Sequence, residues 1–310
     1  MSVGVASVPT VTINENLSTF AGLPVRAWPL DGEPVEGPAA WRISPGLEAA
    51  RGEFALRLEE LADYTTVEAL VVGDWGDCYE NPAPIGELVA AAPRMPGLRA
   101  LFLAEMTFEE CEISWIRLGD VAPLFEVFGA LEVLRIRGSE ALRLGPVRHE
   151  TLRELTFESG GLPREVVRDV GASDFPALRH LELWLGTPDY GGDATAEDLA
   201  GILSGERLPA LRHLGLRNAE IADEVAAALA HAPVVPRLAT LDLSLGLLGD
   251  AGVRALLAGQ DLSGLERLDL HHHVVSEEAL GALAAALPGV VLDTGDSQLG
   301  ERYRYVAVGE

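Results

Sequence analysis

Residues 211–243 read LRHLGLRNAEIADEVAAALAHAPVVPRLATLDL, and this stretch decides the fold. It opens with the pattern apolar-x-x-apolar-x-apolar, continues over residues 221–230 with helical spacing, and ends with the same pattern from Leu238. The alternation inside the pattern predicts a short strand, because alternate side chains of a strand face opposite ways. One strand and one helix cannot bury their apolar faces alone, so the stretch predicts stacked neighbouring copies.

The pattern recurs along most of the chain, with successive copies starting 21 to 33 residues apart. Helical spacing follows it again over 251–258 and 276–287, with Ser276 as the expected N-cap. Strands that stack in register through one-way crossovers form a curved parallel sheet with helices outside. The sequence therefore predicts an α/β solenoid, or horseshoe, with the sheet on the concave face and helices on the convex face. The copies start at Val67, Leu98, Leu131, Leu152, Leu178, Leu211, Leu238 and Leu265, with weaker ones at Pro38 and Leu287.

The domain organisation follows from the limits of the repeats. We expect an N-terminal cap over residues 1–37, a solenoid of about ten units over 38–292, and a C-terminal capping strand or tail over 293–310. The alternation of Tyr303–Val308 predicts an edge strand within that tail.

This Leu-x-x-Leu-x-Leu pattern, with a helix after the strand, resembles the leucine-rich repeats of the ribonuclease-inhibitor type. The segments VRHETLRELTFESGGLPREVVR (147–168) and LDLHHHVVSEE (268–278) are similar to a group of uncharacterised bacterial leucine-rich-repeat proteins. That resemblance implies the solenoid fold and no established activity. The chain departs from the family at the turn after each strand, where Asn or Cys is common, because only Asn218 obeys the pattern.

Composition excludes several classes of function. The chain has 310 residues and a net charge of −25, and all of its basic residues are Arg. We therefore expect no nucleic-acid or membrane partner, because no basic stripe is present to neutralise phosphates. The N-terminus lacks the features of a signal peptide, and no apolar stretch is long enough to span a bilayer, so we expect a cytoplasmic protein.

No motif for a phosphate loop, nucleophile elbow or zinc-protease helix occurs, so we expect neither a cofactor nor catalysis.

The two cysteines, Cys78 and Cys111, follow adjacent predicted strands and are too few for a disulfide framework. We expect them to remain a buried, reduced thiol pair.

The positions between the leucines should face the concave side of the sheet. They are small or apolar at first, as at Val71, Phe102 and Val133, and become charged from Arg135 onward. Asp242 and its neighbour on the next strand would repel each other by about 1 kcal/mol in water, so they should attract a cation. The alternative for any one carboxylate is simple solvation on an acidic protein.

The longest repeats place insertions after the strands that start at Val67, Leu98 and Leu178, and these loops are rich in aromatic residues. Exposed Trp and Tyr anchor partners well, although burial or exposure of Trp115 stays open. The concave face and these loops give the predicted partner-binding set: Trp75, Tyr79, Phe102, Arg135, Glu158, Glu182, Trp184, Tyr190, Arg217, Asp242, Asp269 and His271.

Three functions are compatible with these features. The first is a non-enzymatic scaffold that binds a protein or peptide with a basic patch. The second is a metal-dependent enzyme or a metal-binding accessory protein. The third is an internal chaperone or maturation factor of a peptide-modifying pathway, which would receive a hydrophobic segment at Val71, Phe102 and Val133. The second function would use His213, Asp242, Asp269 and His271, with His180 beside them.

Overall fold

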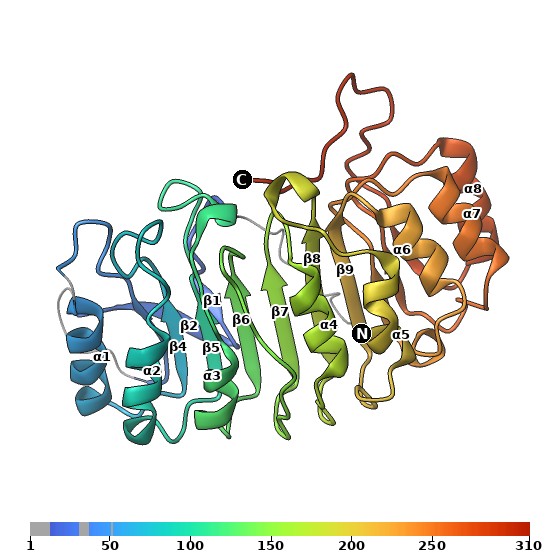
Figure 1. Ribbon diagram of the computed structural model, residues 1–310. Coiled ribbons are helices and arrows are strands. Elements are labelled where there is room, and N and C mark those ends of the chain that lie inside the picture. The colour runs from blue at the N-terminus through green and yellow to red at the C-terminus, as the bar shows by residue number, and fades with distance from the viewer. Residues whose placement is uncertain (1–12, 31–36, 51) are drawn as a thin grey trace.

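The computed structural model describes residues 13–30, 37–50 and 52–310. Within these ranges the strands form one twelve-stranded sheet whose order follows the chain from β1 to β12. All neighbouring strands pair in parallel except β1 and β2. The sheet is open, and helices cover one side of it, which confirms the predicted α/β leucine-rich-repeat solenoid (Figure 1). The strands are β1 (Thr19–Phe20), β2 (Leu23–Trp28), β3 (Ala40–Ile43), β4 (Ala69–Val72), β5 (Ala100–Leu103), β6 (Val133–Arg137), β7 (Glu154–Glu158), β8 (His180–Gly186), β9 (His213–Ala219), β10 (Thr240–Asp242), β11 (Arg267–Asp269) and β12 (Val291–Asp293).

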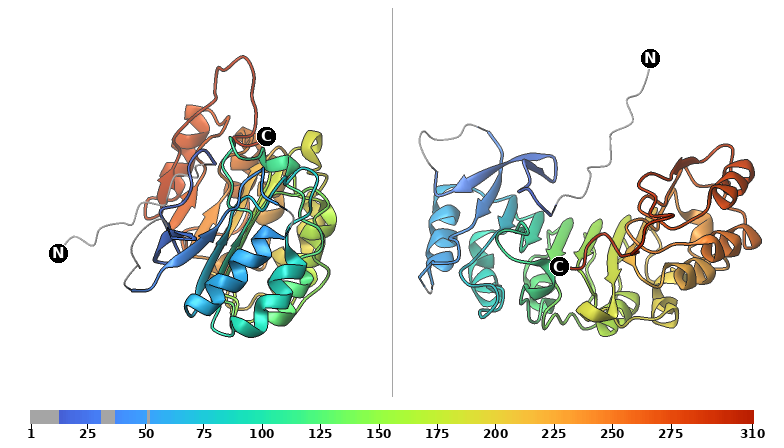
Figure 2. Two further views of the ribbon diagram at one scale, coloured as in Figure 1. Left: turned by 90° about the vertical axis from the view of Figure 1, so that its left-hand side faces the viewer. Right: turned by 90° about the horizontal axis from the view of Figure 1, so that it is seen from above.

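The helices line the outer side of an arc when the molecule is viewed along the strands (Figure 2). The Ser276 side chain accepts a hydrogen bond from the Ala279 N–H, as expected for the N-cap of α8. The helices are α1 (Glu53–Tyr64), α2 (Ile85–Ala91), α3 (Ala122–Val127), α4 (Arg164–Ala172), α5 (Ala200–Ser204), α6 (Ala222–Leu229), α7 (Asp250–Ala258) and α8 (Glu277–Ala286). The 3-10 turns are η1 (Ala92–Arg94), η2 (Ile113–Trp115), η3 (Pro188–Tyr190), η4 (Ala196–Leu199) and η5 (Val235–Arg237).

Equivalent leucines stand side by side in the sheet. Leu214 of β9 pairs with Leu181 of β8 and with Leu241 of β10, and all three are fully buried between sheet and helices. Register is fixed this way because a slip of one residue would turn every leucine to the opposite face. The positions between the leucines are therefore aligned in columns on the inner face, as the sequence predicted.

The ends of the solenoid differ from the sequence analysis. The hairpin of β1 and β2 extends the sheet before the first predicted copy, since β2 pairs in parallel with β3. At the other end, Leu292 pairs with Leu268, so the last copy is aligned two residues later than a start at Leu287. Leu287 instead ends α8, where its N–H bonds to the Leu283 carbonyl.

No strand forms over Tyr303–Val308, so the predicted edge strand is wrong. The segment is irregular, and its apolar alternation reflects alternating burial: Val306 and Val308 are buried, whereas Tyr303 and Tyr305 are exposed. Its hydrogen bonds go to loops and side chains of the solenoid and not to the neighbouring strand.

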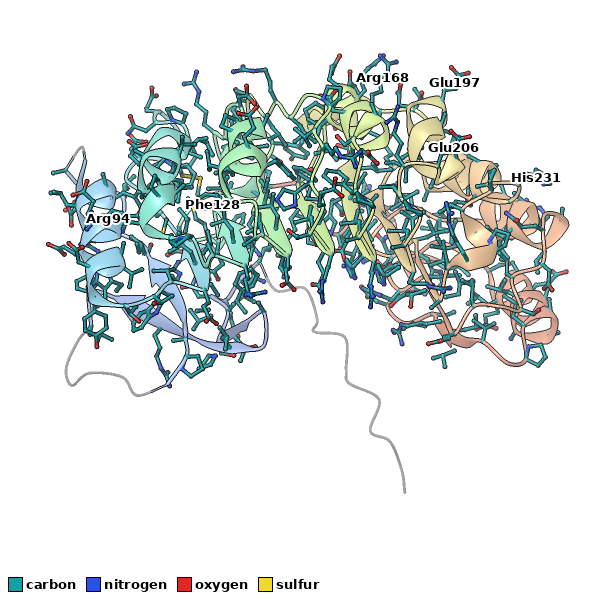
Figure 3. All side chains as sticks on the ribbon, turned by 90° about the horizontal axis from the view of Figure 1, so that it is seen from below. Arg94, Phe128, Arg168, Glu197, Glu206 and His231 are labelled. Carbon is teal, nitrogen blue, oxygen red and sulfur yellow. A yellow bond between two sulfur atoms is a disulfide. The ribbon has the colours of Figure 1, made fainter. Side chains whose placement is uncertain are left out.

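Cys78 and Cys111 form a disulfide, which corrects the expectation of free thiols (Figure 3). The reason is geometric: the two residues lie in the loops after β4 and β5, at the same edge of the sheet. Within the described part of the chain, none of the helices combines the length and the apolarity needed to cross a bilayer.

Candidate functional site

The first part of the inner face is covered by the chain itself. Phe20 and Leu23 of the N-terminal hairpin (β1 and β2) pack on Val71 and Phe102, with Val133 partly buried at the margin. The rings of Phe20 and Phe102 lie 5.8 Å apart. The apolar patch predicted to receive a foreign hydrophobic segment is therefore filled by the protein's own residues.

Carboxylates anchor this cover. The Leu17 N–H donates to Glu105 Oε1 at 2.7 Å, and Arg42 Nε lies 2.6 Å from Glu105 Oε2. Arg42 also pairs with Glu110, which accepts from the Asn16 amide at 3.1 Å. Burial by itself raises the pKa of Glu110, but the Thr107 N–H and Arg42 hold it below its usual range. The N-terminal segment is thus bound by hydrogen bonds to charged groups, which are stronger than neutral ones.

From β6 onward the inner face carries ion pairs. Glu158 is completely buried and pairs with both Arg135 and Arg137, the latter at 2.8 Å. Both guanidinium groups also lie over the Phe102 ring, at 4.9 and 5.3 Å from its centroid. Burial alone raises the pKa of Glu158, but the two Arg groups outweigh it and lower the pKa.

A second ion-pair group lies on β8 to β10. Arg217 binds Glu182 at 2.7 Å and Asp242 at 3.3 Å, and it lies over the Trp184 ring. The Trp184 Nε1–H also donates to Glu182 at 2.7 Å. Burial raises the pKa of Glu182, but hydrogen bonding from His180 and the charge of Arg217 lower it strongly. Burial keeps the pKa of Asp242 raised, because Arg217 opposes it only in part.

Asp242 and Asp269 are paired neighbours, as predicted, but the cation that serves them belongs to the chain. Arg267 binds Asp269 at 2.8 Å, and His271 Nδ1 lies 2.7 Å from the same carboxylate. Burial raises the pKa of Asp269, and these hydrogen bonds lower it to about 2. The bond to Asp269 raises the pKa of His271. The charged inner face is therefore largely neutralised from within.

The predicted site residues thus fall into two places. The charged ones join the ion-pair groups of the inner face, and Phe102, Trp75 and Trp184 are buried. Trp75 donates its Nε1–H to the Asn81 carbonyl. Tyr79 and Tyr190 lie in loops at the edge where the strands end, here called the carboxyl edge, which is the upper edge in Figure 1. A partner-binding role for these residues remains a prediction.

The carboxyl edge also exposes aromatic side chains that the predicted set did not include. Trp115 is 50% exposed and Phe108 is 41% exposed, beside 45% for Tyr79. All three belong to the loops after β4 and β5, which the Cys78–Cys111 disulfide joins. The apolar neighbours of Trp115 in the sequence left its exposure open, so length and composition identified the loop but not the exposed ring.

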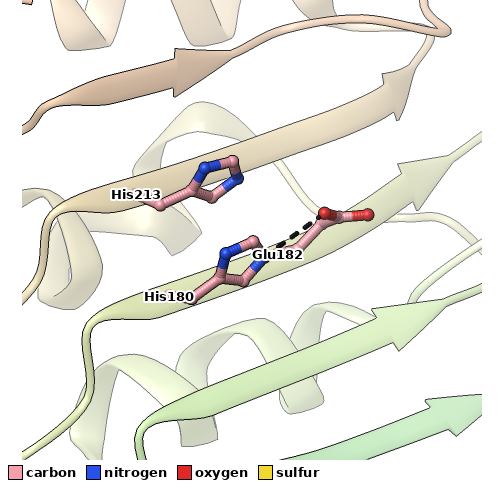
Figure 4. A group of neighbouring side chains, drawn as sticks. All are labelled: His180, Glu182 and His213. Atoms are coloured by element: carbon pink, nitrogen blue, oxygen red, sulfur yellow. Dashed lines mark ion pairs between the residues drawn. The ribbon is translucent and has the colours of Figure 1, made fainter. Parts of the chain in front are cut away.

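The histidines separate into two groups rather than the one predicted. His180, Glu182 and His213 have ligand atoms within 4.8 Å of one another, as do Asp269, His271 and Asp293. His180 and His213 stack with their ring centroids 3.8 Å apart (Figure 4). Nε2 of His213 is buried and has no hydrogen-bond partner among the described residues. Burial lowers the pKa of His213 to about 3, which leaves the neutral imidazole that metals bind.

Comparison with solved structures finds a similar bacterial protein. A protein of Bacteroides fragilis, known from a structural-genomics crystal structure, is 31% identical and superposes with a TM-score of 0.72 over 78% of this chain and 68% of its own. The chain belongs to the same family as this protein. The fold of the family is the leucine-rich-repeat solenoid described above.

A weaker match is the crystal structure of a TLR13–ssRNA13 complex, with 14% identity and a TM-score of 0.39. It covers 87% of this chain and 37% of that one. No family model and no curated protein match the sequence.

Proposed function

We propose that the protein is a non-enzymatic scaffold that binds a protein segment with a basic patch at the carboxyl edge. The observation that carries this proposal is the exposure of Tyr79, Phe108 and Trp115 on two loops that one disulfide joins. Aromatic side chains bury a large area at a low cost in conformational entropy, so they are common binding anchors. Loops that are already tied together lose less entropy on binding.

The charge of these loops supports a basic partner. Glu80 and Glu109 are exposed and Glu112 is half-buried, and no arginine of the described chain forms an ion pair with any of the three. The carboxylates of the inner face differ, because arginines of the chain already neutralise them. Electrostatic attraction would thus act at the loops, and it should raise the association rate and weaken as salt is added.

Photo-cross-linking in the cell of origin tests the site. A photoreactive residue at position 115 should capture a partner, whereas one at the exposed Leu257 of helix α7 should not. Equal capture at both positions, or capture at neither, would contradict the proposal.

Charge substitutions then test the chemistry on the captured complex. Glu80→Gln with Glu109→Gln should weaken it and reduce its salt dependence. The matched control, Glu277→Gln with Glu278→Gln on the outer helix α8, changes net charge equally and should have no effect. A complex indifferent to salt and to both double variants would rule out a basic partner.

A metal-binding accessory role is the second candidate, and the unpartnered Nε2 of His213 favours it. The stacking of His180 and His213 keeps their nitrogen lone pairs in two parallel planes, so one ring would have to tilt for both to bind one ion with Glu182. Equilibrium dialysis with Zn²⁺ tests this role. One equivalent bound by the wild type and lost in His213→Gln supports it, and no bound equivalent excludes it.

Three finer features belong to the same proposal. We propose that the repeats are of the ribonuclease-inhibitor type, that residues 1–37 and 293–310 cap a solenoid of residues 38–292, and that the protein is cytoplasmic. Positions 1–12 and 31–36 of the proposed N-terminal cap lie outside the described residues. The Cys78–Cys111 disulfide would make the protein an exception in that compartment, because stable disulfides are typical of oxidising compartments. Fractionation of the cells of origin tests the location: recovery with cytosolic markers supports the proposal, and recovery outside the cytosol contradicts it.

A further inference from the structure

Residues 306–310, here called the tail segment, cross the carboxyl edge over the ends of the middle strands (Figure 2). The Val308 N–H donates to Asn218 Oδ1 at 3.0 Å, and Asn218 Nδ2 donates to the Val308 carbonyl at 2.6 Å. One amide side chain therefore binds both main-chain groups of one residue. Because every residue except proline carries these two groups, such a contact recognises extended backbone regardless of side chain.

The side chain of Val308 occupies an apolar pocket. Ile113, Trp184 and Leu245 pack around it, and Val308 is buried although it lies at the end of an irregular segment. Ile13 closes the pocket from the N-terminal side. These apolar side chains surround a valine in the structure, so the pocket suits an apolar side chain of that shape.

Further contacts hold the backbone on either side of Val308. The Ala307 N–H donates to the Leu245 carbonyl at 2.8 Å, and the Gly309 carbonyl accepts from Ser114 Oγ at 2.5 Å. A Cβ added at Gly160 would lie only 2.0 Å from the Gly309 carbonyl oxygen. The glycine therefore leaves room for close approach of a peptide chain.

The tail segment is attached differently from the rest of the chain. None of these hydrogen bonds belongs to the ladder of the sheet, and the preceding Tyr303 and Tyr305 are exposed. Open clefts of about 510 and 400 Å³ border the segment, the first lined by Tyr190 and Glu220 and the second by Phe108 and Leu245. Segments that lie outside the cooperative ladder of a sheet open at a lower free energy than the core.

We propose that this groove, formed by Asn218, Ser114 and the Trp184 pocket, is a peptide-binding site that the tail segment occupies in cis. Its ligand in trans is an extended peptide with valine or a similarly small β-branched residue at the position of Val308. The site goes beyond the proposed function, because it reads main-chain groups and one apolar side chain and not positive charge. Binding in it should be nearly independent of salt.

The full-length variant Val308→Arg tests the proposal, because a charged side chain in the apolar pocket should expel the tail segment. The probe is a fluorescently labelled peptide of residues 304–310, RYVAVGE. We expect it to bind the Val308→Arg protein at least tenfold more tightly than the wild type, whose groove is occupied. Adding Asn218→Asp, which removes the amide donor and tolerates the positive φ of this position, should reverse that gain at least tenfold. Equal binding to wild type and Val308→Arg, or binding to neither, overturns the proposal.

Hydrogen exchange of the wild-type protein keeps the test decisive even if Val308→Arg does not fold. The amides of Ala307 and Val308 should exchange at least a hundredfold faster than that of Leu216 in β9, because the segment opens without global unfolding. If all three exchange at the same rate, the segment is part of the cooperative core and the proposal is wrong.

Discussion

Two parts of the inner face differ in how their inward side chains are accommodated. On β4 and β5 the inward positions are small or apolar, and the N-terminal hairpin covers them. On β6 to β11 many of the equivalent positions carry charges, and arginine–carboxylate pairs within a strand or between neighbouring strands neutralise one another. A parallel sheet places equivalent residues of adjacent strands about 4.8 Å apart, so the side chains of one column must be able to lie next to one another. Covering and internal neutralisation both meet that condition.

The difference identifies where recognition remains available. The side chains of the covered apolar face and of the neutralised charged face already make their strongest interactions with other residues of the chain. The loops at the carboxyl edge have not, since they keep exposed aromatic rings and unpaired carboxylates. Substitutions in the covered apolar face or in the neutralised charged face should therefore mainly lower stability. Substitutions in the loops of the carboxyl edge should mainly weaken binding.

Removing the buried carboxylate of Glu158 should have a large effect on stability. Glu158→Leu leaves Arg135 and Arg137 without their partner, so we expect a loss of about 3–5 kcal/mol in the free energy of unfolding. Urea denaturation measures it. The control Glu132→Leu breaks the pairs with the exposed Arg99 and Arg153 and should cost no more than about 1 kcal/mol.

A triple replacement sharpens the comparison between the two halves. Replacing Arg135, Arg137 and Glu158 together by Met, Leu and Leu makes this part of the face apolar, like β4 and β5. Because buried ion pairs contribute little net stability over apolar packing, most of the loss should be recovered. If the triple variant is as unstable as Glu158→Leu, the ion pairs are not interchangeable with apolar packing here.

The cover over the apolar half comes next. Phe20→Ala removes a buried ring from Phe102, and we expect it to lower the free energy of unfolding by about 2–3 kcal/mol. The matched control Phe108→Ala removes an exposed ring and should change stability by less than about 0.5 kcal/mol. Equal effects of the two substitutions in urea denaturation would show that the hairpin is not a tightly packed cover.

The repeat pattern predicted much of this molecule, and its failures have physical causes. The spacing of leucines fixed register, so Asp242 and Asp269 were correctly expected on adjacent strands. Their neutralisation was not predictable, because Arg217 reaches Asp242 from a strand 25 residues earlier and only its rotamer decides that contact. The hairpin lacks the repeat pattern altogether.

The loops and the tail segment were harder still. Asn218 was noted as the one residue that fits the family turn, yet its amide holds Val308, 90 residues away. The spacing of residues in the sequence does not predict a hydrogen bond between two segments that lie so far apart in the chain. Likewise the loop lengths located the aromatic edge, but only the packed structure distinguishes buried Trp75 from exposed Trp115.

A pH titration gives a smaller effect within the charged half. Burial lowers the pKa of His213 to about 3, with the charge of His180 acting in the same direction and Glu182 opposing it. The unfolded chain then binds more protons below pH 6.5, so stability is full above that pH and falls by up to ~1.4 kcal/mol per unit toward pH 3. The slope should be visible from about pH 6.5 to 5, before most carboxylates titrate.

His213→Gln should flatten this slope in urea unfolding, whereas His231→Gln on the exposed outer side (Figure 3) should leave it unchanged. His271 does not mask the result. Its pKa is raised in the folded state, so its contribution is complete below pH 6.5 and is lost only at higher pH. A wild-type slope that survives His213→Gln would show that this imidazole is not buried in solution.

The smallest effect on stability should come from the side chain with the largest proposed effect on binding. Trp115→Ala removes a half-exposed ring, so the free energy of unfolding should change by less than about 0.5 kcal/mol while capture of the partner is lost. Trp184→Ala is the matched contrast, because it removes a fully buried ring and the hydrogen bond to Glu182 and should cost about 3–5 kcal/mol. Recognition at the inner face, and not at the carboxyl edge, would reverse the binding result: Trp115→Ala would retain the partner under conditions in which the folded Trp184→Ala protein releases it.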